Sequence, residues 1–255
     1  MAMPFSDQLK HQADPIWRAI YSHPFLNELH AGTLPMDRFT YFILQDYLYL
    51  LDFAQVLCLG GSKSPDLKTL EIFTRHALIA VEVERSFHAT FGRSLGFSQK
   101  QLDNAPKGPI TEAYTRHLQA VARGGSLGEI VAAVLPCYWI YGEVGKRLYK
   151  NRPKSPKIYR EWIETYASEE FWKPVREQIH LLNRLGANAK GDEKRVLRSH
   201  FLLSSRYEFL FWDQAYHRCP KEPMLKPPLF ISLLVLSLLT GYADAGAAYE
   251  LNGEP

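Results

Sequence analysis

The stretch from Ser126 to Tyr149, SLGEIVAAVLPCYWIYGEVGKRLY, does most to decide the fold of this chain. Ser126 and Glu129 have the spacing of a capping box, in which a serine and a glutamate side chain bind the free N–H groups at the start of a helix. The residues that follow are mostly apolar and do not alternate with polar residues as those of a half-buried strand would. The stretch therefore predicts a long helix that lies in the core.

Helix signals of the same kind recur on both sides of this stretch. Prolines stand where first turns are expected, and glycines or Gly-Gly pairs stand where helices should end. No other stretch shows the sustained alternation of a strand. We therefore expect an all-α bundle of about nine helices, which include residues 6–21, 36–60, 65–91, 109–124, 126–149, 156–166 and 193–216 and a helix capped by Ser168.

The character of the chain changes after His217. Proline-rich segments interrupt the helical pattern, and residues 229–239 are then almost wholly apolar. This apolar run is shorter than the roughly 20 residues that a membrane-spanning helix needs. We expect one helical domain over residues 1–218 and an atypical tail of unknown function over residues 219–255, and we do not expect a membrane anchor.

Composition narrows the classes of function. The 255 residues carry a formal net charge of +3, with lysines and arginines scattered, so we expect no nucleic-acid partner. The three cysteines contain no CxxC pair, which argues against a disulfide framework or a structural zinc site. Reduced thiols and an N-terminus without a signal-peptide pattern are typical of a cytoplasmic protein, and we expect that location.

Cys137 lies in the middle of the opening stretch and is its most reactive residue type. Tyr141 is four residues further on, so the thiol and the phenol share one helix face. Pro136 removes a backbone hydrogen bond beside the cysteine. A thiol next to a proton donor suits a nucleophile, but a lone cysteine in a helix is also a common small core residue. The residues alone leave both interpretations open.

Two other expected helices place an acid among apolar residues. Asp46 and Tyr49 are three residues apart in one, and Glu208 and Phe211 repeat that spacing in the other. A carboxylate in an apolar helix is costly to bury unless it reaches a partner, a ligand or solvent. Ion pairs, for example with Arg206, are one explanation, and a shared ligand pocket is the other.

Four segments, taken in order, resemble one known family. They are QDYLYL at 45–50, PCYWIYGEVG at 136–145, TYASEEF at 165–171 and EFLFWD at 208–213. Their order and spacing resemble the TenA family over about Pro4–Tyr216. The resemblance implies a haem-oxygenase-like helical fold, a homotetramer, and an enzyme that needs no metal or other cofactor.

The resemblance also implies a reaction and a site. The cysteine-bearing branch of the family, thiaminase II, hydrolyses 4-amino-5-aminomethyl-2-methylpyrimidine, and thiamin, to 4-amino-5-hydroxymethyl-2-methylpyrimidine. By motif, Cys137 would be the nucleophile, Glu208 the proton-transferring acid and Asp46 the carboxylate that holds the pyrimidine. The aromatic residues that would hydrogen-bond or stack around the substrate are Tyr49, Tyr114, Tyr141, Tyr166 and Phe211.

Two other functions are compatible with the same fold. A metal-dependent oxidase would need ligands such as the i,i+4 pairs Glu84–His88 and Asp213–His217. A pyrimidine-binding or regulatory module would need no thiol at position 137. We prefer the hydrolase, because Cys137, Asp46 and Glu208 occur together.

Overall fold

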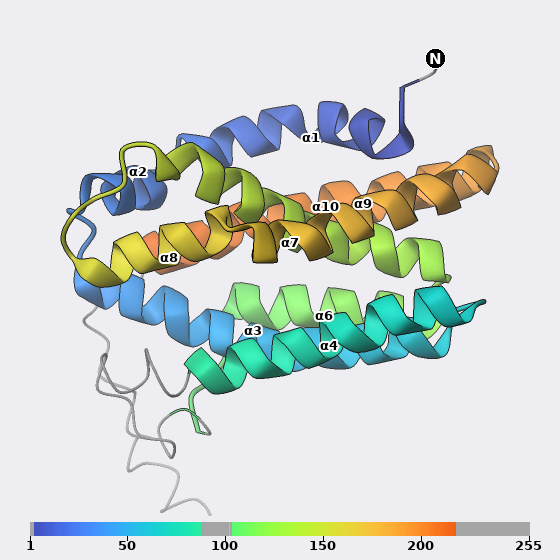
Figure 1. The fold of residues 1–255 in the computed structure, drawn as a ribbon, viewed down its shortest axis with the longest axis horizontal. Helices are drawn as coiled ribbons and strands as arrows, with labels where there is room; N and C mark the ends of the chain where they lie inside the picture. The colour runs from blue at the N-terminus through green and yellow to red at the C-terminus, as the bar shows by residue number, and fades with distance from the viewer. Residues whose placement is uncertain (1–2, 88–101, 103, 218–255) are drawn as a thin grey trace, which may run out of the picture. The chain divides into compact units, whose positions relative to one another are not determined.

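The computed structural model describes residues 3–87, 102 and 104–217, and within these ranges it contains nine helices and no strand (Figure 1). The prediction of an all-α fold is therefore confirmed. The helices are α1 Phe5–Tyr21, α2 Pro24–Ala31, α3 Met36–Ser62, α4 Leu67–Phe87, α6 Pro109–Gly124, α7 Leu127–Tyr149, α8 Lys157–Ala167, α9 Glu169–Asn188 and α10 Gly191–His217.

Helix α7 lies at the centre of the bundle. It packs against α10, α8, α9 and α6, while α3 packs against α4 and α6 on one side (Figure 1). By length and composition alone α3 and α7 could each cross a membrane, but most of the apolar window of each is buried inside the bundle. Burial of these two apolar helices against their neighbours provides much of the hydrophobic core.

The expected caps fix where α7 and α9 begin. The Ser126 backbone N–H donates to Glu129 Oε1 at 3.0 Å, and the Glu129 N–H donates to Ser126 Oγ at 3.3 Å, so the capping box is confirmed. Ser168 caps α9 by accepting a hydrogen bond from the Phe171 N–H at 3.2 Å.

Helix α2 was not expected from the sequence. His23 caps its start by accepting a hydrogen bond from the Phe25 N–H at its Nδ1, and Gly32 ends it with a φ of 75°. A glycine is required there, because a side chain would be strained at this φ and its Cβ would lie 2.5 Å from the Ser155 carbonyl oxygen. The helix has only 8 residues, too few to show a helical period clearly.

The start of α4 also differs from the expectation. The sequence predicted a start at residue 65, but the helix begins at Leu67, and the side chain of the preceding Asp66 accepts a hydrogen bond from the Thr69 N–H at 2.7 Å. The expected end of this helix at Phe91 and the expected tail over residues 219–255 lie outside the described residues.

Candidate active site

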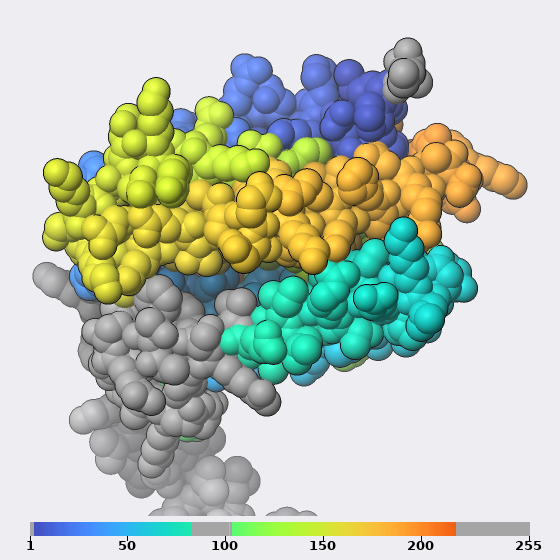
Figure 2. Space-filling view, viewed as in Figure 1, coloured from blue at the N-terminus to red at the C-terminus, as the bar shows by residue number. Residues whose placement is uncertain are grey.

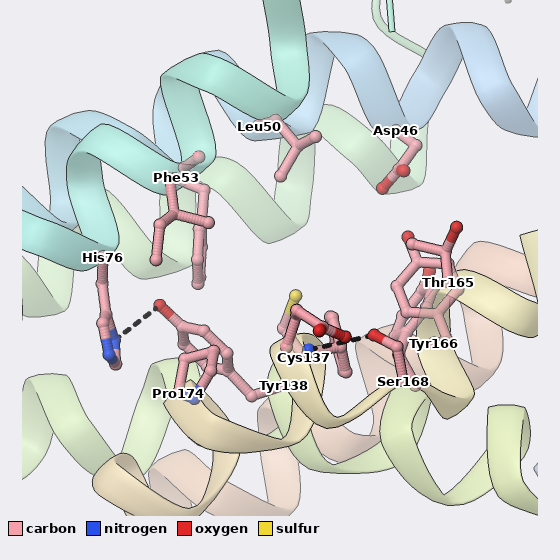
Figure 3. A pocket seen from close by; sticks show the side chains of 15 residues that line it. Asp46, Leu50, Phe53, His76, Cys137, Tyr138, Thr165, Tyr166, Ser168 and Pro174 are labelled. Atoms are coloured by element: carbon pink, nitrogen blue, oxygen red, sulfur yellow. Dashed lines mark hydrogen bonds between the residues drawn. The ribbon is translucent and has the colours of Figure 1, made fainter. Parts of the chain in front are cut away.

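A cavity of about 340 Å³ lies between α3, α4, α7, α8 and the start of α9 (Figure 3). Aromatic and aliphatic side chains form most of its wall, and its polar groups include the Asp46 carboxyl and the Cys137 thiol. Exposed lining residues such as Thr165 and Glu170 mark its mouth. A mostly apolar cavity with a few convergent polar groups is the usual form of a small-molecule site.

Helical spacing aligns the two long walls. Asp46, Leu50 and Phe53 lie on one face of α3 at i, i+4 and i+7, so this wall runs for about 10 Å along the helix. Cys137 and Tyr141 lie one turn apart on α7, so they share a face of that helix, and both line the cavity. The sulfur of Cys137 points into the space between the two helices (Figure 3).

The third wall of the cavity depends on a close approach between the backbones of α7 and α8. A Cβ on Gly145 of α7 would lie 2.5 Å from the Tyr166 carbonyl carbon, so only glycine allows the end of α8 to come this near. The approach brings Tyr166 into the cavity wall, with its ring centroid 4.9 Å from that of Tyr141. Ser168, which caps α9, lies in the same wall.

A buried layer adjoins the cavity. Tyr114 of α6 donates a hydrogen bond from its hydroxyl to Glu208 Oε1 of α10 at 2.7 Å, and both residues are almost completely buried. The ring of Tyr49 lies 5.1 Å from Tyr114 and 6.0 Å from Phe211. The Tyr49 side chain interacts with the thiol of Cys137, so the layer and the cavity meet at this cysteine.

All eight residues that the motifs singled out therefore come together. Asp46, Cys137, Tyr141 and Tyr166 line the cavity. The other four form the buried layer: Tyr49, Tyr114, Glu208 and Phe211. Their roles remain predictions, but their convergence favours a shared pocket.

The two carboxyl groups are buried without a cation. Neither Asp46 nor Glu208 forms an ion pair within the described residues, and neither is paired with Arg206. Desolvation raises the pKa of Asp46 to about 7. Desolvation also raises the pKa of Glu208 to about 8, with a further increase from Asp46, although the hydrogen bond from Tyr114 opposes it. Near neutral pH Glu208 is therefore mostly protonated, and Asp46 is close to its midpoint of ionisation.

The thiol of Cys137 is also held in its neutral form. Burial raises its pKa well above the usual range, and the nearby Glu208 and Asp46 raise it further, while Tyr49 lowers it. The residue is partly exposed, into the cavity that it lines. A thiolate at this position thus needs a positive charge that the described side chains do not supply.

The sequence pattern did not single out several residues of the cavity wall. His76 of α4 and Tyr138 of α7 form one end of the cavity, and Phe53 lies close to Tyr138, with ring centroids 5.4 Å apart (Figure 3). His76 lies on the buried face of α4 with Phe73 and Ala80, at helical spacing. A histidine on that otherwise apolar face was the feature from which this end of the cavity could have been predicted.

Comparison with known proteins assigns the chain to a family. Residues 10–218 match the sequence model of the TENA/THI-4/PQQC family. The chain belongs to this family. It is 37% identical over 216 residues to the aminopyrimidine aminohydrolase of Bacillus subtilis (strain 168), and the alignment covers 85% of this chain and 91% of that protein.

Solved structures support the family and its fold. A TenA homologue from P. horikoshii OT3 superposes with a TM-score of 0.77 at 28% identity, over 84% of this chain and 99% of that one. A domain with a heme oxygenase-like fold from Shewanella denitrificans OS217 gives a TM-score of 0.66 over 82% of this chain and 91% of that one. At 18% identity this second likeness concerns the fold alone, and it confirms the expected haem-oxygenase-like bundle.

Of the two pairs considered for a metal-dependent oxidase, only Asp213 and His217 lie among the described side chains. Asp213 and His217 form an ion pair of 3.0 Å at the end of α10, away from the cavity wall. The side chains of Glu84 and His88 lie outside the described residues. Among the described residues, no group of three or more His, Cys, Asp and Glu side chains has the geometry of a metal site.

Proposed function

We propose that this chain is an aminopyrimidine aminohydrolase that uses Cys137 as its nucleophile. Its substrate would be 4-amino-5-aminomethyl-2-methylpyrimidine, with thiamin as a second substrate, and its product 4-amino-5-hydroxymethyl-2-methylpyrimidine. The observation that carries the proposal is a single cavity that holds Cys137 and Asp46, with Glu208 in the adjoining buried layer. The named activity of the relative from Bacillus subtilis supports the same reaction class.

The raised pKa values suggest how the substrate would activate the site. An aminopyrimidine whose ring nitrogen is protonated would supply the positive charge that the pocket lacks. Asp46, with a pKa of about 7, can ionise and hold that ring nitrogen and the neighbouring amino group. The added charge would then lower the pKa of Cys137 and favour its thiolate.

The chemical steps follow from this charge balance. The Cys137 sulfur forms a bond to a ring carbon, and the displaced electrons break the C–N bond at the exocyclic methylene. Glu208, protonated because its pKa is about 8, gives its proton to the departing amine. Water then adds to the methylene carbon and returns a proton to Glu208. The C–S bond breaks, the ring becomes aromatic again, and the net change is water consumed and ammonia released.

The first experiment measures ammonia released from 4-amino-5-aminomethyl-2-methylpyrimidine by the purified full chain. Cys137→Ala should lower kcat by on the order of a thousandfold, because among the described residues that line the cavity only Cys137 carries a thiol. Cys58→Ala is the matched control, since Cys58 is exposed on α3 and lies outside the cavity wall. Its activity should equal that of the parent.

Two results would contradict the proposal. A folded Cys137→Ala variant that keeps most of its activity would exclude the cysteine mechanism. A folded parent that binds the pyrimidine but turns over neither substrate would indicate a binding or regulatory module.

A further inference from the structure

The mouth of the cavity carries a carboxylate that the proposed reaction does not use. Glu170 lines the cavity and is exposed, whereas Asp46, deeper in the same lining, is only 9% exposed. Glu170 forms no ion pair or hydrogen bond within the described residues. Its neighbour Glu169 pairs with Arg176 at 2.6 Å and does not line the cavity. Of the two acids in the first turn of α9, only Glu170 thus faces the cavity without a cation.

The rest of the lining does not compensate this charge. Among the described residues, no lysine or arginine lines the cavity. His76 does, but desolvation lowers its pKa, so its buried ring is neutral. Lys173, three residues after Glu170 in α9, is exposed and lies outside the lining. A low-dielectric cleft bordered by one sign of charge concentrates ligands of the opposite sign, so this mouth favours cations.

Helix α9 brings Glu170 to the part of the cavity that contains the reacting thiol. Ser168 caps the helix, and Glu170 and Pro174 lie one turn apart on the face that lines the cavity. Cys137 lies between Ser168 and Pro174 in the view of Figure 3. The turn that carries Glu170 connects these two residues, so its charge borders the space in front of the thiol.

A leaving group beside Cys137 can be enlarged in only one direction. The layer behind the thiol is filled by buried side chains, among them Tyr49 and Phe211. A leaving group larger than ammonia must therefore extend through the cavity toward α9 and its mouth. The thiazolium of thiamin is such a group, and it carries a permanent positive charge.

We propose that Glu170 is a specificity-determining residue that attracts a cationic leaving group and repels an anionic one. The inference rests on the proposed function, in which Asp46 holds the pyrimidine and Cys137 lies next to the methylene. It extends that function, because it assigns to the mouth a choice between substrates that share the same aminopyrimidine. A phosphate on the leaving group would lie near the Glu170 carboxylate and would weaken binding.

The test changes the charge at position 170. Calorimetry measures the Kd of thiamin for the full-length Cys137→Ala variant, in which the ligand is not cleaved. Adding Glu170→Gln should raise this Kd by about fivefold, and Glu170→Lys should raise it by more than about tenfold, because a unit charge near the thiazolium is worth about 1 kcal/mol in water. The neutral product 4-amino-5-hydroxymethyl-2-methylpyrimidine should bind all three proteins with nearly the same Kd.

The charge of the ligand is then changed. The Kd of thiamin monophosphate divided by that of thiamin isolates the effect of the phosphate. This ratio should fall by about fivefold in Glu170→Gln and further in Glu170→Lys, and 0.5 M salt, roughly half the 1 M that shortens the Debye length to about 3 Å, should reduce both differences. A purely structural defect would not depend on the charge of the ligand or on salt.

The neighbouring acid provides the matched controls. Glu169→Gln and Glu169→Lys make the same charge changes in the same turn of α9, but outside the cavity lining. They should change the Kd ratio by less than about twofold, since exposed charges outside the mouth are screened by solvent and salt. Thermal melting checks that each variant is folded.

Different results separate the two claims. A folded Glu170→Lys that keeps the parent's Kd ratio overturns the inference and leaves the proposed function intact. Equal changes in the Glu169 and Glu170 variants also overturn it, because the effect would then follow net charge and not the position at the mouth. A full chain with Cys137 intact that cleaves no aminopyrimidine contradicts the proposed function, whatever the ratio shows.

Discussion

The two ends of the cavity bury carboxyl groups in opposite ways. Asp46 and Glu208 lie at the Cys137 end without a cation, and desolvation raises the pKa of both. Glu177 lies behind the other end, where it binds Arg75 Nη1 at 2.8 Å and His76 Nε2 at 2.8 Å. Despite its desolvation, these contacts lower its pKa.

The two ends differ in whether the buried carboxyl group has a charged partner: Asp46 and Glu208 have none, whereas Glu177 has Arg75. Burying a carboxylate costs desolvation free energy. Attraction to an adjacent cation offsets part of this cost, and a carboxylate without such a partner has no compensation. Strongly perturbed pKa values in a cavity are typical of catalytic and binding groups. Under the proposed function, a cationic substrate would complete the charge balance at the unpaired end, whereas the ion pairs at the other end hold the cavity wall in place.

The largest effect should come from removing the transferable proton at the unpaired end. Glu208→Gln keeps an acceptor for the Tyr114 hydroxyl but cannot transfer a proton, so kcat for ammonia release should fall by about a hundredfold to ten-thousandfold. The Kd for the hydroxymethyl product should change little. Glu164→Gln is the control, because Glu164 is also a helical carboxylate but pairs with Arg152 outside the cavity. Full activity in a folded Glu208→Gln would place proton transfer elsewhere.

The second effect concerns stability. The folded pKa of Asp46 and Glu208 lies above the value expected in the unfolded chain, so the folded state holds more protons between about pH 4.5 and pH 8. Their contribution is fully present below that window and is lost as pH rises through the folded pKa. From about pH 5.5 to pH 8 the loss should be roughly 3 kcal/mol for Glu208, at about 1.4 kcal/mol per pH unit.

Denaturant unfolding of the empty protein across this pH range checks the sign. Glu208→Gln and Asp46→Asn should each flatten the fall in unfolding free energy toward high pH. A parent whose stability rises steadily from pH 5.5 to pH 8 would show that these carboxyls are ionised in the folded state.

The sequence predicted most of the fold because its signals are local. The capping box at Ser126, the cap at Ser168 and the long apolar runs of α3 and α7 each depend on residues within one helix. Helix α2 was missed because 8 residues do not show a helical period. The start of α4 was placed two residues early, at the proline of position 65, because a proline is typical of a first helical turn.

The site was predictable only in part, because sequence signals are local whereas the site depends on contacts between helices. Asp46, Cys137 and Glu208 stand out because each is an unusual residue in an apolar helix. His76 and Tyr138 do not stand out in the sequence, because their contacts form only when α4, α7 and α9 pack together. Nor could spacing show that Asp46 lines the cavity while Glu208 lies in the layer next to it.

The smallest effect tests the paired end. Arg75→Met removes the cation beside Glu177, whose lowered pKa contributes stability that is present near neutral pH and lost as pH falls. Because Arg75 is about one-third exposed, solvent screens the pair, and the variant should lose less than about 1 kcal/mol at pH 7. The difference in stability between the variant and the parent should shrink as pH falls toward 4, because Glu177 is then increasingly protonated in the variant. Thermal melts at the two pH values measure it.

Arg195→Met is the matched control for this last variant, because Arg195 pairs with Asp192 where both side chains are highly exposed and should contribute almost nothing. If Arg75→Met costs no more than Arg195→Met, the pair at Glu177 adds no stability, and the contrast between the two ends reduces to burial alone. If it costs more and the deficit disappears in acid, the pairing itself keeps Glu177 ionised. An ionised Glu177 is what holds the hydrogen of His76 on Nε2, which leaves Nδ1 to accept from the Gln178 amide.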